Sequence, residues 1–396
     1  MALGVKRIIR STPREDYAPG DVIVVNDPWL LAGHLNDVCV LSPIFYKETP
    51  VAFTACVFHH SDIGGRVASD NREVFEEGLF IPPVKLYDAG VLNKAVLEMI
   101  RWNVRTPEEV TGDLRSQVAA NHVCAEKIVE MMADEGLSTL DDLADEIIAR
   151  TERSMRRAIQ AIPNGTYPFE GVIEGSGNRE DIKIKLTVGV EESDILVDFN
   201  GTAPQVGWGV NVVYNFTYAY VFMAIKSAFD PDLPINEGAI RPVKMTAPEG
   251  SVVNCSFPAA VAARMQVGHF MTEMVFRALS AATPDRIIAG SGGTPAQTNI
   301  FYGKRHNGKP WHTMIIRGGG LGAGKRQDGH HCAIFPANGA NTPVEILESD
   351  TPLLVESREL LCDSGGAGTH RGGLGRRMQL RIPDDETAPI PPVAIA

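Results

Sequence analysis

Paired cysteines are missing from this sequence. Its six cysteines are scattered along the chain and none stands in a CxxC pair, so neither a zinc ribbon nor a disulfide framework is indicated. We therefore expect free, mostly buried thiols. Long apolar runs are missing too: no segment reaches the roughly 18 consecutive apolar residues of a membrane helix, and the apolar stretch at the start is too short for a secretory signal. We expect a cytoplasmic protein without a membrane anchor.

Positive charge is in short supply. The 37 Lys and Arg side chains are outnumbered by 49 Asp and Glu, which gives a formal charge of -12 and disfavours phosphate backbones and anionic lipid surfaces as partners. Nucleic acid is therefore not expected as a ligand. Apolar residues are plentiful: they make up 44% of the 396 residues, enough to bury the cores of two or three domains.

Two apolar segments near the start have the composition of β-strands. The first, VIVVND at 22–27, follows a helical VKRIIR run and a YAPGD turn, and it ends at polar residues. The second runs from Pro50 to His60 and continues into the polar loop HHSDIGG. Both strands thus end in His, Asp or Asn side chains, and strand ends of this kind are a usual place for a functional site.

The later chain alternates between helical and strand patterns. Between 111 and 162, two amphipathic runs predict a helical hairpin, whose second helix has Ser138 and Thr139 as candidate caps. From 166 to about 199 the alternation of apolar and polar residues predicts antiparallel strands. Further apolar helices and a glycine-rich C-terminal third follow, ending in a Pro-rich tail without periodicity.

The sharpest chemical signal is the pair of motifs GHLNDV and FHHSDIGG. They supply His34, Asp37 and His59, which are two imidazoles and one carboxylate. Such a set suits a divalent metal that keeps open positions for water or substrate. Because neutral imidazoles and one carboxylate leave the ion with net positive charge, a bound water can ionise near neutral pH and attack an electrophile. Three ligands therefore predict a catalytic rather than a structural metal.

Spacing alone leaves an ordinary interpretation open. His34 and His59 can be polar residues at strand ends, with Asp37 capping a turn. His60 and Asp62 crowd the same loop, and either can orient a ligand imidazole through its other nitrogen or serve only the loop structure.

These patterns together predict a mixed α+β, multidomain fold. Its four parts are a strand-rich metal-site domain (1–110), a helical hairpin insert (111–162), an antiparallel sheet and helix region (163–260), and an incomplete glycine-rich α+β region (261–396).

Three further features are weaker. The run GGLGAGKR satisfies GxxxxGK, but Arg326 stands where a phosphate loop needs Ser or Thr for magnesium, so we interpret it as a glycine-rich loop. His330 and His331 are adjacent, so their side chains point in different directions from an extended chain, and no third ligand is evident. Arg264 and His269 interrupt an Ala-rich apolar stretch, where they either reach a cleft or pair with buried acids. A structural role is slightly favoured for both.

Seven motifs, in order from about Val5 to Gly375, together resemble the hydantoinase B/oxoprolinase family. They are GDVIVVNDPWLLAGHLNDV, FHHSDIGG, EEGLFIPPVKL, DLRSQVAAN, NEGAIRPVKMTAPEGSVVN, NTPVEILESDTPLLVE and DSGGAGTHRGGLG. The family includes the second subunit of N-methylhydantoinase and caprolactamase, the C-terminal part of 5-oxoprolinase, and related subunits of acetone and acetophenone carboxylases. In the resemblance, His34, Asp37 and His59 match the positions of the family's metal ligands.

The resemblance implies a two-part enzyme. A hydantoinase A-type subunit uses ATP to phosphorylate the carbonyl oxygen of the substrate, and this B-type subunit completes the reaction with a divalent zinc, manganese or iron ion. We expect a hydrolase acting on a cyclic amide such as a lactam, hydantoin or 5-oxoproline. The alternatives are a ketone carboxylase that uses bicarbonate, which shares these motifs, and a scaffold without chemistry.

The sequence departs from the family pattern at both ends. Family members carry a further stretch before Ala2, including an Asp that serves as another metal ligand, and they continue past the GGLG motif. These differences predict that the sequence is a fragment or has a misassigned start. They also make tight metal binding by this polypeptide alone an open question.

Overall fold

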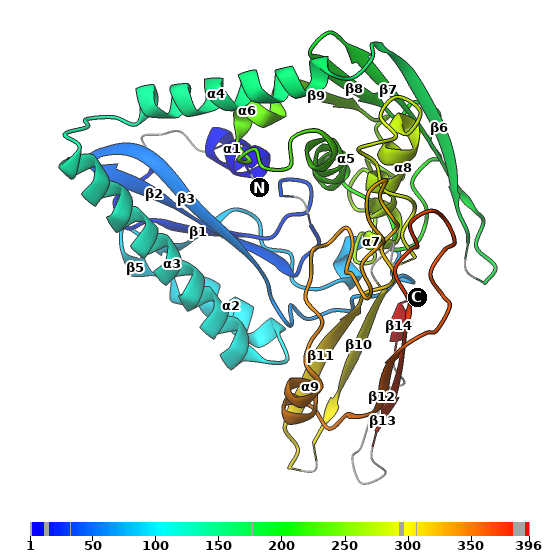
Figure 1. Cartoon of the computed structure of the whole chain (residues 1–396). Helices are drawn as coiled ribbons and strands as arrows, with labels where there is room; N and C mark the ends of the chain where they lie inside the picture. The colour runs from blue at the N-terminus through cyan, green and yellow to red at the C-terminus, as the bar shows by residue number, and fades with distance from the viewer. Residues whose placement is uncertain are drawn as a thin grey trace.

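The computed structural model describes residues 2–11, 16–31, 33–175, 177–292, 297–305, 307–382 and 393–395. The helices are α1 (Ala2–Ser11), α2 (Lys94–Asn103), α3 (Pro107–Asp134), α4 (Asp141–Gln160), α5 (Tyr214–Phe229), α6 (Glu237–Ile240), α7 (Met265–Gly268), α8 (Phe270–Leu279) and α9 (Val344–Asp350). The strands are β1 (Val22–Val25), β2 (Asp37–Tyr46), β3 (Thr49–His59), β4 (Val84–Asp88), β5 (Val91–Leu92), β6 (Gly165–Ile173), β7 (Ile182–Glu191), β8 (Asp194–Asp198), β9 (Val243–Thr246), β10 (Gln297–Lys304), β11 (Pro310–Arg317), β12 (Leu354–Leu360), β13 (Arg376–Arg381) and β14 (Val393–Ile395). The chain is multidomain and mixed α+β, as the sequence predicted (Figure 1).

The first sheet is antiparallel, in the order β3-β2-β1-β4-β5, and helices cover both of its faces. Val22 and Val24 of β1 lie in the main core with α2 and α3, whereas Ile23 and Val25 pack against Ile8 of α1 in a second cluster. Because successive side chains of a strand point to opposite faces, a strand covered on both sides is apolar throughout, which explains the VIVV run. Figure 1 shows α3 lying along this sheet.

Strand β2 was missed by the sequence patterns, although the two strands on either side of it in the chain were predicted. Pro43 and Ser42 interrupt its apolar run, and Pro cannot donate to a strand ladder. Pro43 is opposite Phe53 of β3 and lies beyond residues 39–41, the part of β2 that pairs with β1, so β2 has an open edge there. A two-residue turn at Lys47 and Glu48, both with positive φ, joins β2 to β3 as a tight hairpin.

The two helices predicted between 111 and 162 are present as α3 and α4. They diverge from their connection: α3 packs on β2 and β3, whereas α4 packs on α5, α6 and β8 (Figure 1). Helix α4 begins later than the candidate caps suggested, because Leu140 occupies the N-cap position. The Thr139 hydroxyl still accepts a hydrogen bond from the backbone N–H of Asp141, at 2.9 Å, so it satisfies one donor of the first turn.

The second sheet has the order β6-β7-β8-β9 and is covered by α5 and α8. Its first three strands are antiparallel, as predicted, but β9 joins β8 in parallel. One continuous hydrophobic core links this sheet to the first. The C-terminal strands form two small sheets with a separate core around Trp311, Ile315, Leu347 and Leu353.

The cysteines and helices meet most of the expectations from composition. All six cysteines are free, as predicted, but only Cys39 and Cys255 are buried, so the expectation of mostly buried thiols was wrong. Cys56 of β3 and Cys124 of α3 lie on faces that are partly or fully exposed, and Cys332 and Cys362 lie in turns at the surface. Within the described residues, no helix is both long enough and apolar enough to cross a bilayer.

Candidate metal centre

Strand pairing brings two of the three candidate ligands together. Asp37 is the first residue of β2, His59 is the last residue of β3, and the two stand directly opposite each other in the antiparallel ladder. Directly opposed residues have Cβ atoms about 5 Å apart and side chains on the same face of the sheet. The carboxylate and the imidazole are therefore neighbours as a result of strand register alone.

A tight turn brings in the third ligand, His34. The backbone N–H of Asp37 donates to the His34 carbonyl at 3.0 Å, and the His34 N–H donates to Asp37 Oδ2 at 3.2 Å. Gly33 makes this turn possible, because a Cβ atom at that position would lie only 1.7 Å from Asp37 Oδ2. The glycine of the GHLNDV motif thus leaves room for the carboxylate.

The three side chains form a compact group. One ligand atom from each of His34, Asp37 and His59 lies within 4.8 Å of the others. The two imidazole centroids are 4.8 Å apart, and His34 Nε2 lies 3.9 Å from Asp37 Oδ1. Ligand atoms around a tetrahedral ion are about 3.3 Å apart, so a small inward shift would complete the first shell. Among the described residues, no other group of three or more His, Cys, Asp or Glu side chains has this geometry.

The electrostatics of the group favour neutral imidazoles. His34 is buried, and its pKa is held well below the usual range by that burial, with the charge of Arg264 and then His59 as further causes. Within the described part of the chain, neither ring nitrogen of His34 makes a hydrogen bond of ordinary geometry. His59 is the most open of the three, yet the protein packed around its ring lowers its pKa against the opposing effect of Asp37. Unprotonated imidazoles are the form that binds a metal.

Asn26 supports the segment that carries His34. Its side chain is completely buried at the end of β1, where its amide donates to the carbonyls of Leu35 and Leu79 at 2.7 and 2.9 Å. Its oxygen accepts from the Ile81 N–H at 2.6 Å. This one side chain joins the ligand-bearing turn to a segment more than forty residues away in the chain.

We expect Asn26→Ala to lower the free energy of unfolding by about 3 to 5 kcal/mol, because it leaves three buried backbone groups without partners. Urea unfolding at neutral pH measures the change. Asn26→Asp is the isosteric control: it keeps the acceptor but loses both N–H donors, so it should also destabilise the chain. Unfolding curves for Asn26→Ala that match those of the unmodified chain would show that the turn is held by other contacts.

The structure assigns His60 and Asp62 to other contacts. The His60 side chain points away from the ligand group to α3, where its Nε2 lies 2.9 Å from Gln117 Oε1. This is the expected result for adjacent residues at a strand end. The Asp62 carboxylate binds the backbone and the guanidinium of Arg105, the latter at 2.7 Å, and so fixes the loop after β3. The role of the two side chains in orienting the ligands stays a prediction.

Arg264 belongs to the site, although sequence patterns slightly favoured a structural role. Its Nη2 donates to Asp37 Oδ2 at 2.9 Å, and the side chain is buried. It therefore both reaches the site and pairs with an acid, although that acid is only partly buried. His312 of β11 was missed altogether. It lies with Asp62 and Arg105 around a small cavity of 40 Å³ beside the loop after β3. The C-terminal region borders the site at this cavity.

The features set aside in the sequence make structural contacts. Lys325 of the GxxxxGK run forms an ion pair with Asp285. The exposed His331 ring accepts a hydrogen bond from the Leu374 N–H at 2.8 Å, and Asp328 pairs with His370 rather than with His330 or His331. These contacts hold glycine-rich loops together.

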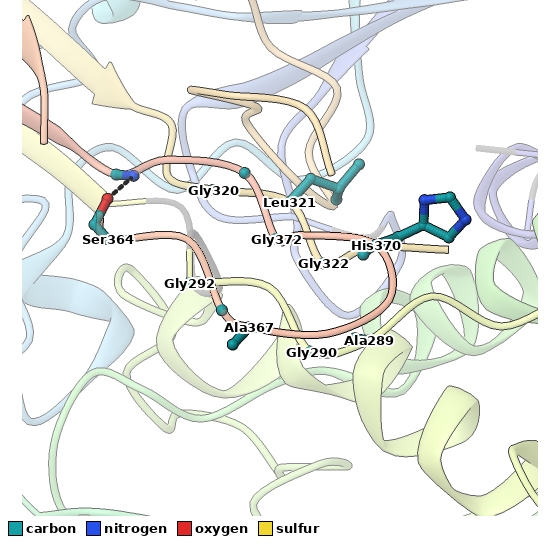
Figure 2. Close-up of a pocket in the computed structure, with 14 residues that line it drawn as sticks. Ala289, Gly290, Gly292, Gly320, Leu321, Gly322, Ser364, Ala367, His370 and Gly372 are labelled. Atoms are coloured by element: carbon teal, nitrogen blue, oxygen red, sulfur yellow. Dashed lines mark hydrogen bonds between the residues drawn. The ribbon is translucent and has the colours of Figure 1, made fainter. Parts of the chain in front are cut away.

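The same loops surround a cavity of 460 Å³, shown in Figure 2. Glycines supply most of its wall, from segments around 290, 320, 366 and 373. Some are required by close backbone crossings: a Cβ at Gly320 would lie 1.9 Å from the Gly373 carbonyl oxygen. Gly366 is different, because a Cβ there would meet nothing within 4 Å. Among the described residues that line the cavity, His370 is the one titratable side chain.

Comparison with known proteins shows the family of the chain. The family model for hydantoinase B/oxoprolinase matches residues 1–390. The chain belongs to the hydantoinase B/oxoprolinase family. It is 34% identical to a protein of Methanocaldococcus jannaschii over 97% of this chain and 68% of that protein. It is 32% identical to the B-type chain of a putative D-/L-hydantoinase of a Pseudomonas species, over 94% of this chain and 65% of that one.

The solved structures show the same fold. The ATP-dependent caprolactamase of Pseudomonas jessenii superposes with a TM-score of 0.90 at 28% identity, over 96% of this chain and 67% of that one. A nucleotide-free acetone carboxylase structure superposes with a TM-score of 0.84 at 21% identity, over 96% of this chain and 54% of that one, which shows a shared fold. The chain of this hydantoinase B/oxoprolinase family member spans about two thirds of the length of its curated hydantoinase relative.

Proposed function

We propose that this chain is the metal-carrying part of an ATP-dependent cyclic-amide hydrolase, and that it completes the hydrolysis of a substrate phosphorylated by an A-type partner subunit. The observation that carries the proposal is the convergence of His34, Asp37 and His59 within 4.8 Å in a member of this family. Hydantoins and lactams are the substrate class we favour, because relatives named for hydantoinase and caprolactamase activity are 30% or more identical to the chain.

The donor set fits a divalent zinc, manganese or iron ion. His34 and His59 would offer neutral nitrogens and Asp37 its Oδ1 oxygen, while Oδ2 stays anchored by Arg264 and by the turn. A divalent ion held there would supply Lewis acidity and an activated water. The protein's own contribution is to hold the three ligand atoms in place, to keep both imidazoles unprotonated, and to place a guanidinium next to the carboxylate.

ATP use is proposed for the partner subunit. We expect the pure chain not to hydrolyse ATP, because Arg326 follows Lys325 where a phosphate loop needs a magnesium-binding hydroxyl, and Lys325 is paired with Asp285. Steady release of phosphate by the chain alone, unchanged in Lys325→Ala, would reveal a nucleotide site elsewhere in it.

The test of the proposed function uses the full-length protein purified with its A-type partner. Metal analysis is combined with ATP-dependent turnover of a panel of lactams, hydantoins and ketones with bicarbonate. We expect about one divalent ion per chain, as a single three-ligand site allows, and turnover of a cyclic amide. Turnover of a ketone only when bicarbonate is present would identify a carboxylase instead, and a metal-free, inactive complex would favour a scaffold.

A further inference from the structure

Helix α3 presents two buried amide side chains, Gln117 and Asn121, to the first sheet. They are four residues apart and therefore lie on the same face of the helix, and they are 0% and 2% exposed. A helix face that covers a sheet is usually apolar, because a buried amide costs free energy unless its hydrogen bonds are made. Both residues belong to the DLRSQVAAN motif, to which the three metal ligands assign no role.

The Gln117 side chain binds both strands of the β2–β3 hairpin. Its Nε2 donates to the carbonyl of Val38 in β2 at 2.8 Å and to that of Cys56 in β3 at 3.4 Å. Its Oε1 lies 2.9 Å from His60 Nε2, and because an amide oxygen can only accept, the imidazole donates this bond. One completely buried side chain therefore joins α3 to three points of the hairpin.

These contacts lie directly beside two of the candidate ligands. Val38 follows Asp37 at the start of β2, and His60 follows His59 at the end of β3. Asp37 and His59 are opposite each other in the ladder. Asn36 exchanges two backbone-side bonds with His60 at the same end, at 2.8 and 3.0 Å, but these join the strand ends only to each other. The glutamine also fixes them relative to the covering helix.

Asn121 makes similar bonds one helical turn farther on. Its Nδ2 donates to the Val40 carbonyl at 3.0 Å, and its Oδ1 accepts from the Thr54 hydroxyl at 3.2 Å. It therefore also joins α3 to β2 and β3, but at a part of the hairpin that is farther from the ligand pair. The two amides are matched in chemistry and burial and differ in their distance along the ladder from the ligands.

We propose that Gln117 is a positioning residue for the proposed metal centre, because it fixes the two strand ends that carry Asp37 and His59. This inference deepens the proposed function, on which it rests for the ion. A ligand set binds its ion tightly only when its atoms are held within about 0.5 Å of the productive geometry. Two of the three Gln117 bonds go to backbone carbonyls, so loss of the His60 ring alone leaves both strands tied to α3.

The first test measures the strand ends in the full-length, metal-free chain. Gln117→Met keeps the approximate volume of the side chain and removes the amide, and Asn121→Leu is the matched control. Hydrogen exchange in EDTA, followed by mass spectrometry, covers residues 34–38 and 57–60. We expect exchange there to be about tenfold faster in Gln117→Met, because the bonds that hold the ends to α3 are lost. Asn121→Leu should change exchange only farther along the hairpin.

The second test titrates Co²⁺ into the same samples by calorimetry, with its visible absorption as a measure of ligand geometry. Both variants should lower Tm, because each leaves buried polar groups without partners. Only Gln117→Met should weaken Co²⁺ binding, by about tenfold or more, and change the absorption spectrum. Circular dichroism confirms folding. If Gln117→Met does not fold, Gln117→Asn replaces it, since it keeps an amide but shortens its reach by one methylene.

Two results would separate this inference from the proposed function. Exchange at the strand ends and Co²⁺ affinity that are the same in the Gln117 and Asn121 variants would overturn the positioning role, even if the chain binds metal. If the unmodified chain bound no Co²⁺, the proposed metal centre would be refuted, and the exchange data would still decide whether Gln117 fixes the strand ends.

Discussion

His59→Ala is expected to abolish stoichiometric metal binding and to lower product formation by about a hundredfold or more in the full-length, partner-bound enzyme. The substitution removes one of three ligand atoms, and the open side of the site at His59 offers no described replacement. The partner subunit should still consume ATP when substrate is present. ATP consumption and product formation would therefore become uncoupled, which a coupled assay of ADP and product measures directly.

Two further variants make this result specific. His331→Ala removes a ring that accepts one hydrogen bond from Leu374 on the surface, so it should cost no more than about 1 kcal/mol of stability and leave metal and product unchanged. His60→Ala removes a buried ring bonded to Gln117 and should destabilise the chain more than it alters metal content. If His59→Ala kept its metal and His331→Ala lost it, the centre would lie in the C-terminal region.

Acidification from pH 7 to 5 is expected to lower the free energy of unfolding of the metal-free chain. Burial lowers the folded-state pKa of His34 and His60, and it lowers that of His269 to about 3, whereas an unfolded histidine titrates near 6.5. Below about pH 6.5 the unfolded chain therefore binds more protons than the folded chain, so stability falls as pH falls. His269 alone accounts for about 2 kcal/mol between pH 6.5 and 5.

Protonation of Glu77 changes the stability in the opposite direction and reduces the loss of stability in acid. Burial raises its pKa to about 8, so between pH 4.5 and 8 the unfolded state releases a proton that the folded state keeps, and acid favours folding there. The effect of the Glu77 carboxyl on stability offsets that of about one buried imidazole. The remaining buried imidazoles therefore decide whether acid raises or lowers the free energy of unfolding. Urea unfolding at pH 7 and 5 in EDTA measures the sum, and His122→Ala, which removes an exposed histidine of α3, should leave it unchanged.

The same imidazoles would set the pH dependence of metal binding at the proposed centre. Because the pKa values of His34 and His59 lie below the usual range, metal affinity should fall less below pH 6.5 than it does at a site built from ordinary histidines. Calorimetric metal titrations across this range provide the measurement. A metal affinity that starts to fall at pH 6.5, with one proton taken up per histidine as the metal is released, would show that the two rings titrate like surface imidazoles.

How far the sequence predicted this site depends on which residue is considered. His34, Asp37 and His59 could be named as candidate ligands from two short motifs, because they lie close together in the chain. Their approach to one another could not, since it depends on the register of β2 against β3, and the Pro43 interruption hid β2. Spacing in sequence contains no information on strand register.

Arg264 was harder to place. It stands 227 positions after Asp37 at the N-cap of α7, and only the tertiary fold brings the two together. A charged residue in an Ala-rich stretch signalled that a partner was needed, but not which one. His312 gave no signal at all, because alternation in β11 does not distinguish a site residue from any other polar strand residue.

The hairpin turn at Lys47 and Glu48 bears on the order in which the centre assembles. A two-residue turn closes with little loss of chain entropy, so Asp37 and His59 can meet early and locally during folding. Arg264 reaches them only after more than two hundred further residues have been synthesised and the long-range core has closed. The nascent chain would thus pass through a stage at which the first sheet is paired but Arg264 has not yet reached Asp37. At the proposed metal centre, the capture of an ion and the arrival of the guanidinium would therefore be separate events in the maturation of this protein.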